Sequence, residues 1–213
     1  MSTESSTQAA TVDNTIPRED ALSSHLSRPN AQGFVHLSVH TEFSLVDSTI
    51  RIKPLVKRVA ASMPAAAVTD RSNMFSLVKY YRAALGAGIK PVVGVDLRVR
   101  SAGEEASVTR ALLLVQNAAG YSNLTNLVSR GYQEGQTDGT PVVELAWLFD
   151  AHEGLIALSG GVSGDVGQAL KRGNADEALD IAKQWQAVFG DRYYLELNRT
   201  GMPFEDHYIA GAC

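Results

Sequence analysis

The stretch that decides the fold is Phe34-Val-His-Leu-Ser-Val-His-Thr-Glu-Phe-Ser-Leu-Val-Asp47, which joins an alternating segment to a polar loop. Residues 34–39 alternate between apolar and polar side chains, which is typical of a half-buried strand. Residues 52–60 then carry apolar side chains at i, i+3, i+4, i+7 and i+8, the stripe of an amphipathic helix. The segment therefore predicts a strand, a loop and a helix in succession.

The same unit recurs along the rest of the chain. Short apolar runs predict strands at residues 65–68, 91–99, 111–115, 155–158 and 193–197, with a polar hairpin at 101–107. Helical stripes or glycine-bounded segments predict helices at residues 77–85, 121–128, 165–173 and 175–189. Repeated strand–helix units favour an α/β fold with a mainly parallel sheet and outer helices, either open or closed into a barrel.

Composition places the chain among ordinary globular proteins. It has 213 residues, of which 45% are hydrophobic and 20% charged. Residues 1–33 are rich in small polar side chains and show no apolar period, so we expect a disordered leader followed by one domain at 34–213. The leader lacks the apolar core of a secretory signal, and no stretch reaches the ~18 apolar residues of a membrane span.

Charge and cysteine content narrow the class further. The net charge of −4 argues against a domain whose main task is to grip the phosphate backbone of DNA. The single cysteine, Cys213, excludes an internal disulfide and a cysteine-rich metal site. Both features fit a cytoplasmic protein that makes no use of a membrane.

Polar residues gather where the predicted strands end, which is where α/β folds bind their ligands. They lie in five stretches: residues 36–40, 43–47, 69–71, 94–96 and 158–161. The stretches hold too few His and carboxylate groups for tight metal binding. Structural alternatives also exist, since His36 could be a buried histidine and Asp47 and Asp70 could cap helices.

Several motifs together resemble the PHP (polymerase and histidinol phosphatase) domain at the N-terminus of bacterial DNA polymerase III alpha subunits. They match in order and spacing from Phe34 to Cys213: residues 34–47, 64–70, 88–94, 120–124, 153–161 and 193–197. The resemblance implies a PHP-type distorted (β/α)7 barrel that is incomplete at its C-terminus. It also implies that the chain is a truncated N-terminal piece of the polymerase subunit.

Active PHP domains use clustered His and acidic residues to bind zinc or manganese ions and hydrolyse phosphoesters. By position, His40 and Asp47 remain as potential ligands, and Asp96 replaces a Glu. Non-ligating residues occupy the other positions, namely Ser38, Arg71, Gly161 and Thr200. The resemblance therefore implies a vestigial zinc or manganese cluster at His40, Asp47, Asp96, Arg71 and Ser38, with no catalytic residue and no bound metal expected.

Arg71 is the strongest single argument for lost metal binding. A permanent cation within the cluster would repel metal ions, and it could pair with Asp47, Asp70 or Asp96. We therefore hypothesise that an arginine–carboxylate network occupies the former metal cavity.

Three functions follow from the resemblance. The first is a structural role: a PHP domain of the replicative polymerase. This domain docks the proofreading exonuclease subunit and contacts other holoenzyme subunits. The second is a metal-dependent 3′–5′ exonuclease or phosphoesterase, and the third is the error-prone paralogue of the alpha subunit. In each case nucleotidyl transfer, its Mg²⁺ and the DNA contacts would belong to regions downstream, so this fragment itself needs no cofactor.

Overall fold

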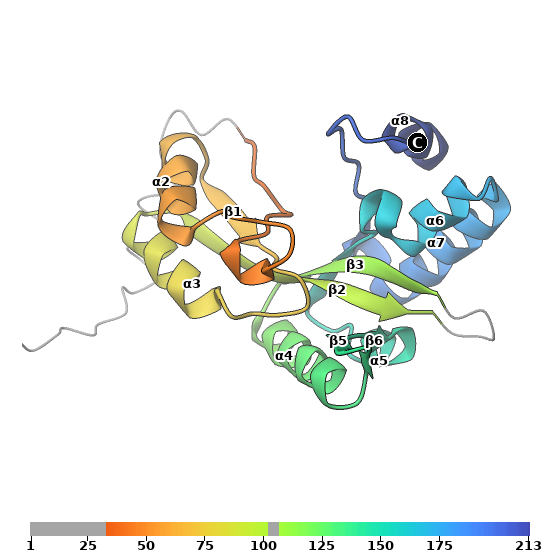
Figure 1. Cartoon of the computed structure of the whole chain (residues 1–213), viewed down its shortest axis with the longest axis horizontal. Helices are drawn as coiled ribbons and strands as arrows, with labels where there is room; N and C mark the ends of the chain where they lie inside the picture. The colour runs from red at the N-terminus through yellow and green to blue at the C-terminus, as the bar shows by residue number, and fades with distance from the viewer. Residues whose placement is uncertain (1–32, 102–106) are drawn as a thin grey trace, which may run out of the picture.

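The computed structural model describes residues 33–101 and 107–213, drawn in colour in Figure 1. The expected leader at residues 1–33 falls almost wholly outside the described residues, as does most of the expected hairpin turn at 101–107. None of the described helices is long and apolar enough to span a membrane.

A mixed sheet forms the centre of the molecule, with the strand order β1-β2-β3-β7-β8 and β6 beside β2. The longest strands, β2 and β3, are antiparallel, and β3 also pairs antiparallel with β7. The pairs β1–β2, β2–β6 and β7–β8 are parallel. The bounds are β1 (Ala65–Val68), β2 (Lys90–Arg100), β3 (Val108–Val115), β6 (Val143–Glu144), β7 (Leu155–Leu158) and β8 (Tyr193–Tyr194).

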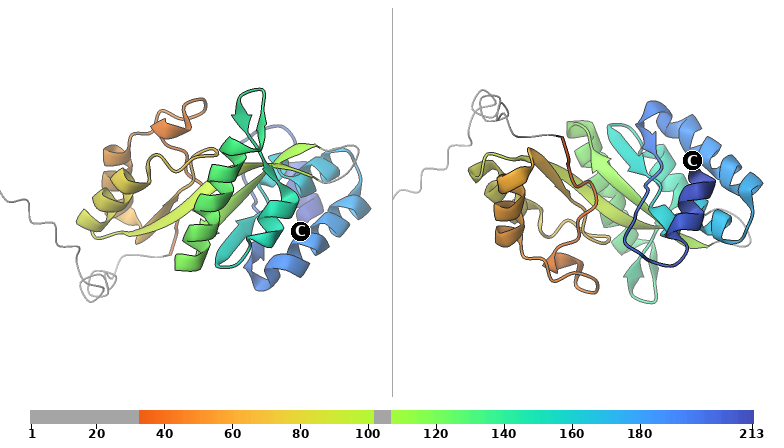
Figure 2. Two further views of the ribbon diagram at one scale, coloured as in Figure 1. Left: turned by 90° about the horizontal axis from the view of Figure 1, so that it is seen from below. Right: turned by 90° about the horizontal axis from the view of Figure 1, so that it is seen from above.

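Helices surround the β2–β3 ribbon on two sides, as Figures 1 and 2 show. The helices α2 and α3 pack near β1, α4 and α5 lie against one face of the ribbon, and α6 lies over the other. The bounds are α2 (Ile52–Ser62), α3 (Leu77–Gly86), α4 (Ala118–Gln133), α5 (Leu145–Asp150), α6 (Asp165–Lys171), α7 (Ala175–Phe189) and α8 (Glu205–Ala212). Short 3-10 turns are η1 (Glu42–Ser44), η2 (Gly161–Ser163) and η3 (Gly190–Arg192), and a small hairpin is β4 (Gln136–Thr137) with β5 (Thr140–Pro141).

The two faces of β2 differ in chemistry because side chains alternate along a strand. Val95, Leu97 and Val99 belong to the main hydrophobic core, together with Trp185 and Phe189 of α7. The indole and phenyl rings of that pair stack with centroids 5.6 Å apart. The opposite face carries the charged residues of β2. The apolar face thus packs in the core, and the charged face is available for polar contacts.

Most predicted elements are confirmed, but three expectations require correction. The sheet is mixed rather than mainly parallel; of the two alternatives left open by the sequence, the described residues form an open sheet. Residues 34–39 do not form a strand; only His36 makes a bridge, to Ala66. The predicted strand at 193–197 shortens to β8, because residues 195–197 leave the ladder.

The physical reason for the missing first strand is limited pairing. The segment lies beside β1, where the His36 carbonyl accepts from Ala67 N at 2.7 Å and the Val39 carbonyl accepts from Thr69 N at 2.9 Å. These two bonds do not extend into a continuous ladder. Leu37, expected on a buried face, is exposed, as is His36, so the interpretation of His36 as a buried histidine is wrong.

Gly120 shows how closely α4 packs against the backbone at Gly154. It lies in the first turn of α4, directly against the backbone of Gly154, and a Cβ at this position would overlap the Gly154 carbonyl oxygen. The helix is anchored there by Asn117, whose side chain accepts from Gly120 N at 3.0 Å. This cap satisfies one of the free N–H groups at the helix start.

Gly120→Ala should destabilise the fold by about 1–3 kcal/mol, because backbone must move to admit the methyl group. The matched control is Gly86→Ala at the end of α3, where a Cβ meets nothing within 4 Å. Urea unfolding followed by circular dichroism measures both. Equal stabilities of the two variants would contradict the close packing of α4 against Gly154.

Candidate functional site

The site is built on Asp70, which lies two residues after the end of β1 and is only 1% exposed. Its carboxylate accepts from Thr41 N at 2.6 Å, from the Ser44 hydroxyl at 2.8 Å and from the Ser76 hydroxyl at 2.6 Å. The Thr41 hydroxyl lies within 2.9 Å of both carboxylate oxygens. A buried carboxylate is stable when it accepts several hydrogen bonds, and here they tie the loop at 41–44 to the approach to α3. The capping role considered for Asp70 is therefore wrong, since it binds the Ser76 side chain and caps no helix.

His40 lies between two carboxylates that come from distant parts of the chain. Its Nδ1 is 3.0 Å from Asp47 Oδ2, and its Nε2 is 2.9 Å from Asp96 Oδ2. Asp47 belongs to the loop after η1, whereas Asp96 is a buried residue of β2. Burial lowers the pKa of His40, and this effect exceeds the opposing influence of the Asp47 carboxylate, which raises it.

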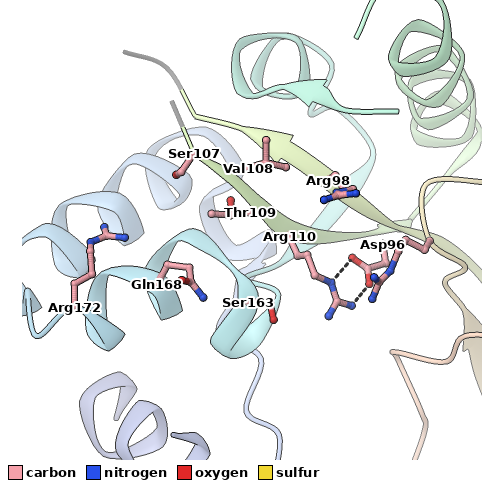
Figure 3. A pocket seen from close by; sticks show the side chains of 10 residues that line it. Asp96, Arg98, Ser107, Val108, Thr109, Arg110, Ser163, Gln168 and Arg172 are labelled. Carbon is pink, nitrogen blue, oxygen red and sulfur yellow. Dashed lines mark hydrogen bonds and ion pairs between the residues drawn. The ribbon is translucent and has the colours of Figure 1, made fainter. Parts of the chain in front are cut away.

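Each of these carboxylates also contacts an arginine. Arg71 Nη2 lies 2.6 Å from Asp47 Oδ2, and Arg110 Nε lies 3.1 Å from Asp96 Oδ1. A second contact, between Arg110 Nη2 and Asp96 Oδ2, makes that pair bidentate, as Figure 3 shows. The result is a continuous chain of contacting side chains, which we call the ion-pair chain, in the order Arg71, Asp47, His40, Asp96, Arg110.

The two arginines lie close enough to influence one another. Burial lowers the pKa of Arg110, and the positive charge of Arg71 lowers it further. The Nε of Arg71 is buried and has no hydrogen-bond partner among the described residues. The site therefore has hydrogen-bond donor capacity that its own carboxylates do not use.

A metal cluster does not fit this arrangement. The two carboxylates lie on opposite ring nitrogens of His40, so the three groups cannot converge on one ion. Each carboxylate is also engaged by a guanidinium, which a cation would have to displace. Within residues 33–101 and 107–213, no group of three or more His, Cys, Asp or Glu side chains is placed to hold a metal ion.

The structure brings together four of the five predicted positions and separates the fifth. His40, Asp47, Asp96 and Arg71 meet as described, and Arg71 pairs with Asp47 rather than with Asp70. Ser38 is exposed and lines a different groove, of about 740 Å³, next to His36 and Asn198.

Gly161 and Thr200 occupy the two other positions where a metal ligand of the family is missing, and both have structural roles. Gly161 has φ = 59°, a left-handed conformation that favours glycine, and it begins η2. Thr200 donates from its backbone N and its hydroxyl to Glu205, both at 2.7 Å. These bonds lower the pKa of the Glu205 carboxyl and fix the start of α8.

Sequence reasoning missed Arg110, Thr41, Ser44 and Ser76. Arg110 was detectable as a charged residue within the apolar strand run that forms β3. The hydroxyl groups gave no such signal, because Ser and Thr are common in loops and their partner Asp70 lies 26 to 29 residues from Thr41 and Ser44.

Comparison with known proteins gives the family. The sequence-family model of the PHP domain matches residues 36–200. The chain belongs to the PHP domain family. The DNA polymerase III subunit alpha of Pseudomonas fluorescens is 51% identical over 180 residues, and that of Escherichia coli K12 is 46% identical over 180 residues. Each alignment covers 84% of this chain, which spans only 15–16% of the length of these relatives.

A solved structure supports the fold of this PHP domain. A Bifidobacterium adolescentis protein assigned as a metal-dependent phosphoesterase superposes with a TM-score of 0.51 at 14% identity. The match covers 84% of this chain and 82% of the other. At this identity the likeness concerns the arrangement of strands and helices alone.

Asp70→Ala should destabilise the PHP domain by about 3–5 kcal/mol, because it leaves several buried donors without an acceptor. Asp47→Ala serves as the control, since Asp47 is partly exposed and its loss should cost about 1 kcal/mol or less. Thermal unfolding by calorimetry compares the two. A smaller loss for Asp70→Ala than for Asp47→Ala would contradict the anchoring role of Asp70.

Proposed function

We propose that this PHP domain is the N-terminal domain of the alpha subunit of a replicative DNA polymerase III, and that it is metal-free, structural and a docking site for the proofreading exonuclease subunit. In that setting it would act in the cytoplasm with other holoenzyme subunits, and polymerase regions outside this chain would bind DNA and Mg²⁺. Further segments of the longer protein would complete the PHP barrel.

The observation that carries the proposal is the arginine–carboxylate chain around His40. Both ring nitrogens face carboxylates, and both carboxylates pair with arginines. Because guanidinium groups already engage both carboxylates, these residues do not fit the metal ions that activate water in metal-dependent family members. The ion pairs instead join the loop at 40–47 to β2 and β3, which supports a structural role.

A surface beside this loop supports docking. Leu45 and Val46 are 81% and 83% exposed, and Phe75 and Val78 are 65% and 63% exposed. The two pairs lie on neighbouring segments, because Asn73 Nδ2 donates to the Phe43 carbonyl at 3.0 Å. We name residues 45, 46, 75 and 78 the apolar loop surface. Clustered exposed apolar side chains of this kind mark protein interaction sites.

The untagged, purified chain should contain zinc and manganese at well below one ion per molecule, because the carboxylates are already bound by arginines. Inductively coupled plasma mass spectrometry measures the content, and EDTA should leave the melting temperature unchanged. Stoichiometric metal would contradict the proposal. So would phosphoesterase activity that His40→Ala and Asp47→Ala abolish, which would favour the enzymatic alternative.

The full chain should capture the exonuclease subunit in size-exclusion chromatography, and the double variant Val46→Ser/Phe75→Ser should weaken capture about tenfold or more. The control is Leu179→Ser on α7, an exposed apolar residue on a helix remote from α3 in Figure 1. Capture by a complete alpha subunit but not by this chain would contradict docking on the PHP domain. Equal weakening by Leu179→Ser would contradict the apolar loop surface as its site.

A further inference from the structure

Charge is distributed unevenly along the chain and within the fold. Residues 33–101 contain ten Lys and Arg against four Asp and Glu, a formal charge of +6. Residues 107–213 contain seven Lys and Arg against thirteen Asp and Glu, a formal charge of −6. Figures 1 and 2 show α2 and α3 together at one end of the molecule, with α7 and α8 at the other. The net charge of −4 for the whole chain therefore conceals a basic end and an acidic end.

The positive charge of the basic end is concentrated on the outer surface of α2 and α3. Buried apolar side chains of the two helices form one hydrophobic cluster, which holds the helices side by side. Neither helix contains an Asp or Glu, and all of their Lys and Arg residues are exposed. We name these cations, with the one that directly precedes α2, the basic helix surface: Arg51, Lys53, Lys57, Arg58, Lys79 and Arg82.

The cations of the two helices meet on one side of the helix pair. The Glu42 carboxylate lies between them, 3.9 Å from Arg51 Nε and 3.6 Å from Lys79 Nζ. Residues seven apart lie on about the same face of a helix, which places Arg58 two turns beyond Arg51 along α2. Residues three apart are neighbours, which places Arg82 beside Lys79 on α3. The surface therefore contains two adjacent rows of cations with a single carboxylate between them.

This arrangement of charge is unfavourable for the helices themselves. Lys53 and Lys57 are four residues apart, and Lys79 and Arg82 are three apart, spacings at which like charges destabilise a helix. Arg51 and Lys53 also lie at the N-terminus of α2, where the helix dipole favours negative charge. An anionic partner on this surface would offset both effects.

Most of the basic helix surface is available to such a partner. Within residues 33–101 and 107–213, four of its cations form no ion pair, namely Lys53, Lys57, Arg58 and Arg82. The other two share Glu42, which is itself only partly buried. The surface therefore presents at least four positive charges that the described part of the chain does not neutralise.

The composition and length of the surface favour duplex nucleic acid over other anionic partners. Half of its cations are Lys, a residue that is depleted in protein–protein interfaces. The 11 residues of α2 rise about 16 Å, and duplex DNA carries one negative charge per about 1.7 Å of its axis, so several phosphates would face the surface at once. Tyr81 is the one exposed aromatic residue on α2 and α3, both described in full, so stacking of single-stranded bases has little support.

We propose that the basic helix surface binds the phosphate backbone of double-stranded DNA, without regard to base sequence and independently of exonuclease docking. This contact belongs to the PHP domain itself and adds to those proposed for polymerase regions outside this chain. Phosphate contacts position a protein on DNA and carry no sequence information, which matches a surface made of exposed Lys and Arg.

Fluorescence anisotropy of a labelled duplex of about 20 base pairs, titrated with the full chain, tests the proposal. Binding should have a Kd of about 1–100 µM in low salt, the range of non-specific DNA binding. Between about 50 and 200 mM potassium chloride, the logarithm of the affinity should fall against the logarithm of the salt concentration with a slope of about −3 to −4, because four cations replace counterions. Two duplexes of unrelated sequence should bind equally.

The double variant Arg58→Ala/Arg82→Ala should weaken binding about tenfold or more and make the salt slope shallower by about 2, one unit for each lost contact. Arg58→Lys/Arg82→Lys should keep most of the affinity, because Lys also contacts phosphate as a point charge. The matched control Lys183→Ala/Arg199→Ala removes the same charge from two exposed positions in residues 107–213 and should leave binding unchanged. All three variants should keep the melting temperature of the original chain, because the four side chains are exposed.

Four results would overturn the proposal. The first is the absence of binding in low salt, or binding that does not change with salt. The second is equal weakening by Lys183→Ala/Arg199→Ala, which would indicate a general charge effect. The third is tighter binding of a single strand of the same length, which would indicate recognition of bases. The fourth is tighter binding of a glutamate-rich peptide, which would make the basic helix surface a site for an acidic protein.

Discussion

The buried carboxylate of Asp70 is the constraint on which the site depends. It follows β1 and accepts hydrogen bonds from Thr41, Ser44 and Ser76, so one side chain fixes the loop before α2 and the approach to α3. Ser44 in turn accepts from Arg71 N at 3.1 Å, which sets the backbone that carries the Arg71 guanidinium. The positions of His40 and Arg71 therefore both follow from a carboxylate that takes no part in the ion-pair chain.

The ion-pair chain around His40 is held together by attraction between arginine and carboxylate side chains. Arg71 and Arg110 neutralise Asp47 and Asp96, which in a metal site would carry the negative charge that holds the ions. Paired, partly buried charges of this kind fix geometry more than they add stability. In this PHP domain these contacts join the loop at 40–47 to β2 and β3.

The β2–β3 ribbon separates two functions by the alternation of its side chains. One face supplies Val95, Leu97 and Val99 to the core, and the other presents Asp96, Arg98 and Arg110. Because the apolar face is held by α4, α5 and α7, the charged face can carry an unfavourable arginine pair without loss of the fold.

The sequence by itself determined most of the helices, though not α5, and the main strands, because their apolar periods are local and strong. Through the motifs of the family resemblance it also grouped His40, Asp47, Arg71 and Asp96, although the expected strand-end position is wrong for Asp96, which lies within β2. Only the tertiary structure decided that β2 and β3 are antiparallel, that residues 34–39 remain outside the ladder and that Arg110 joins the site. These depend on pairing between segments far apart in the chain, such as His40 with Asp96, 56 residues away. Local side-chain patterns carry no information about such pairing until the sheet brings the partners together.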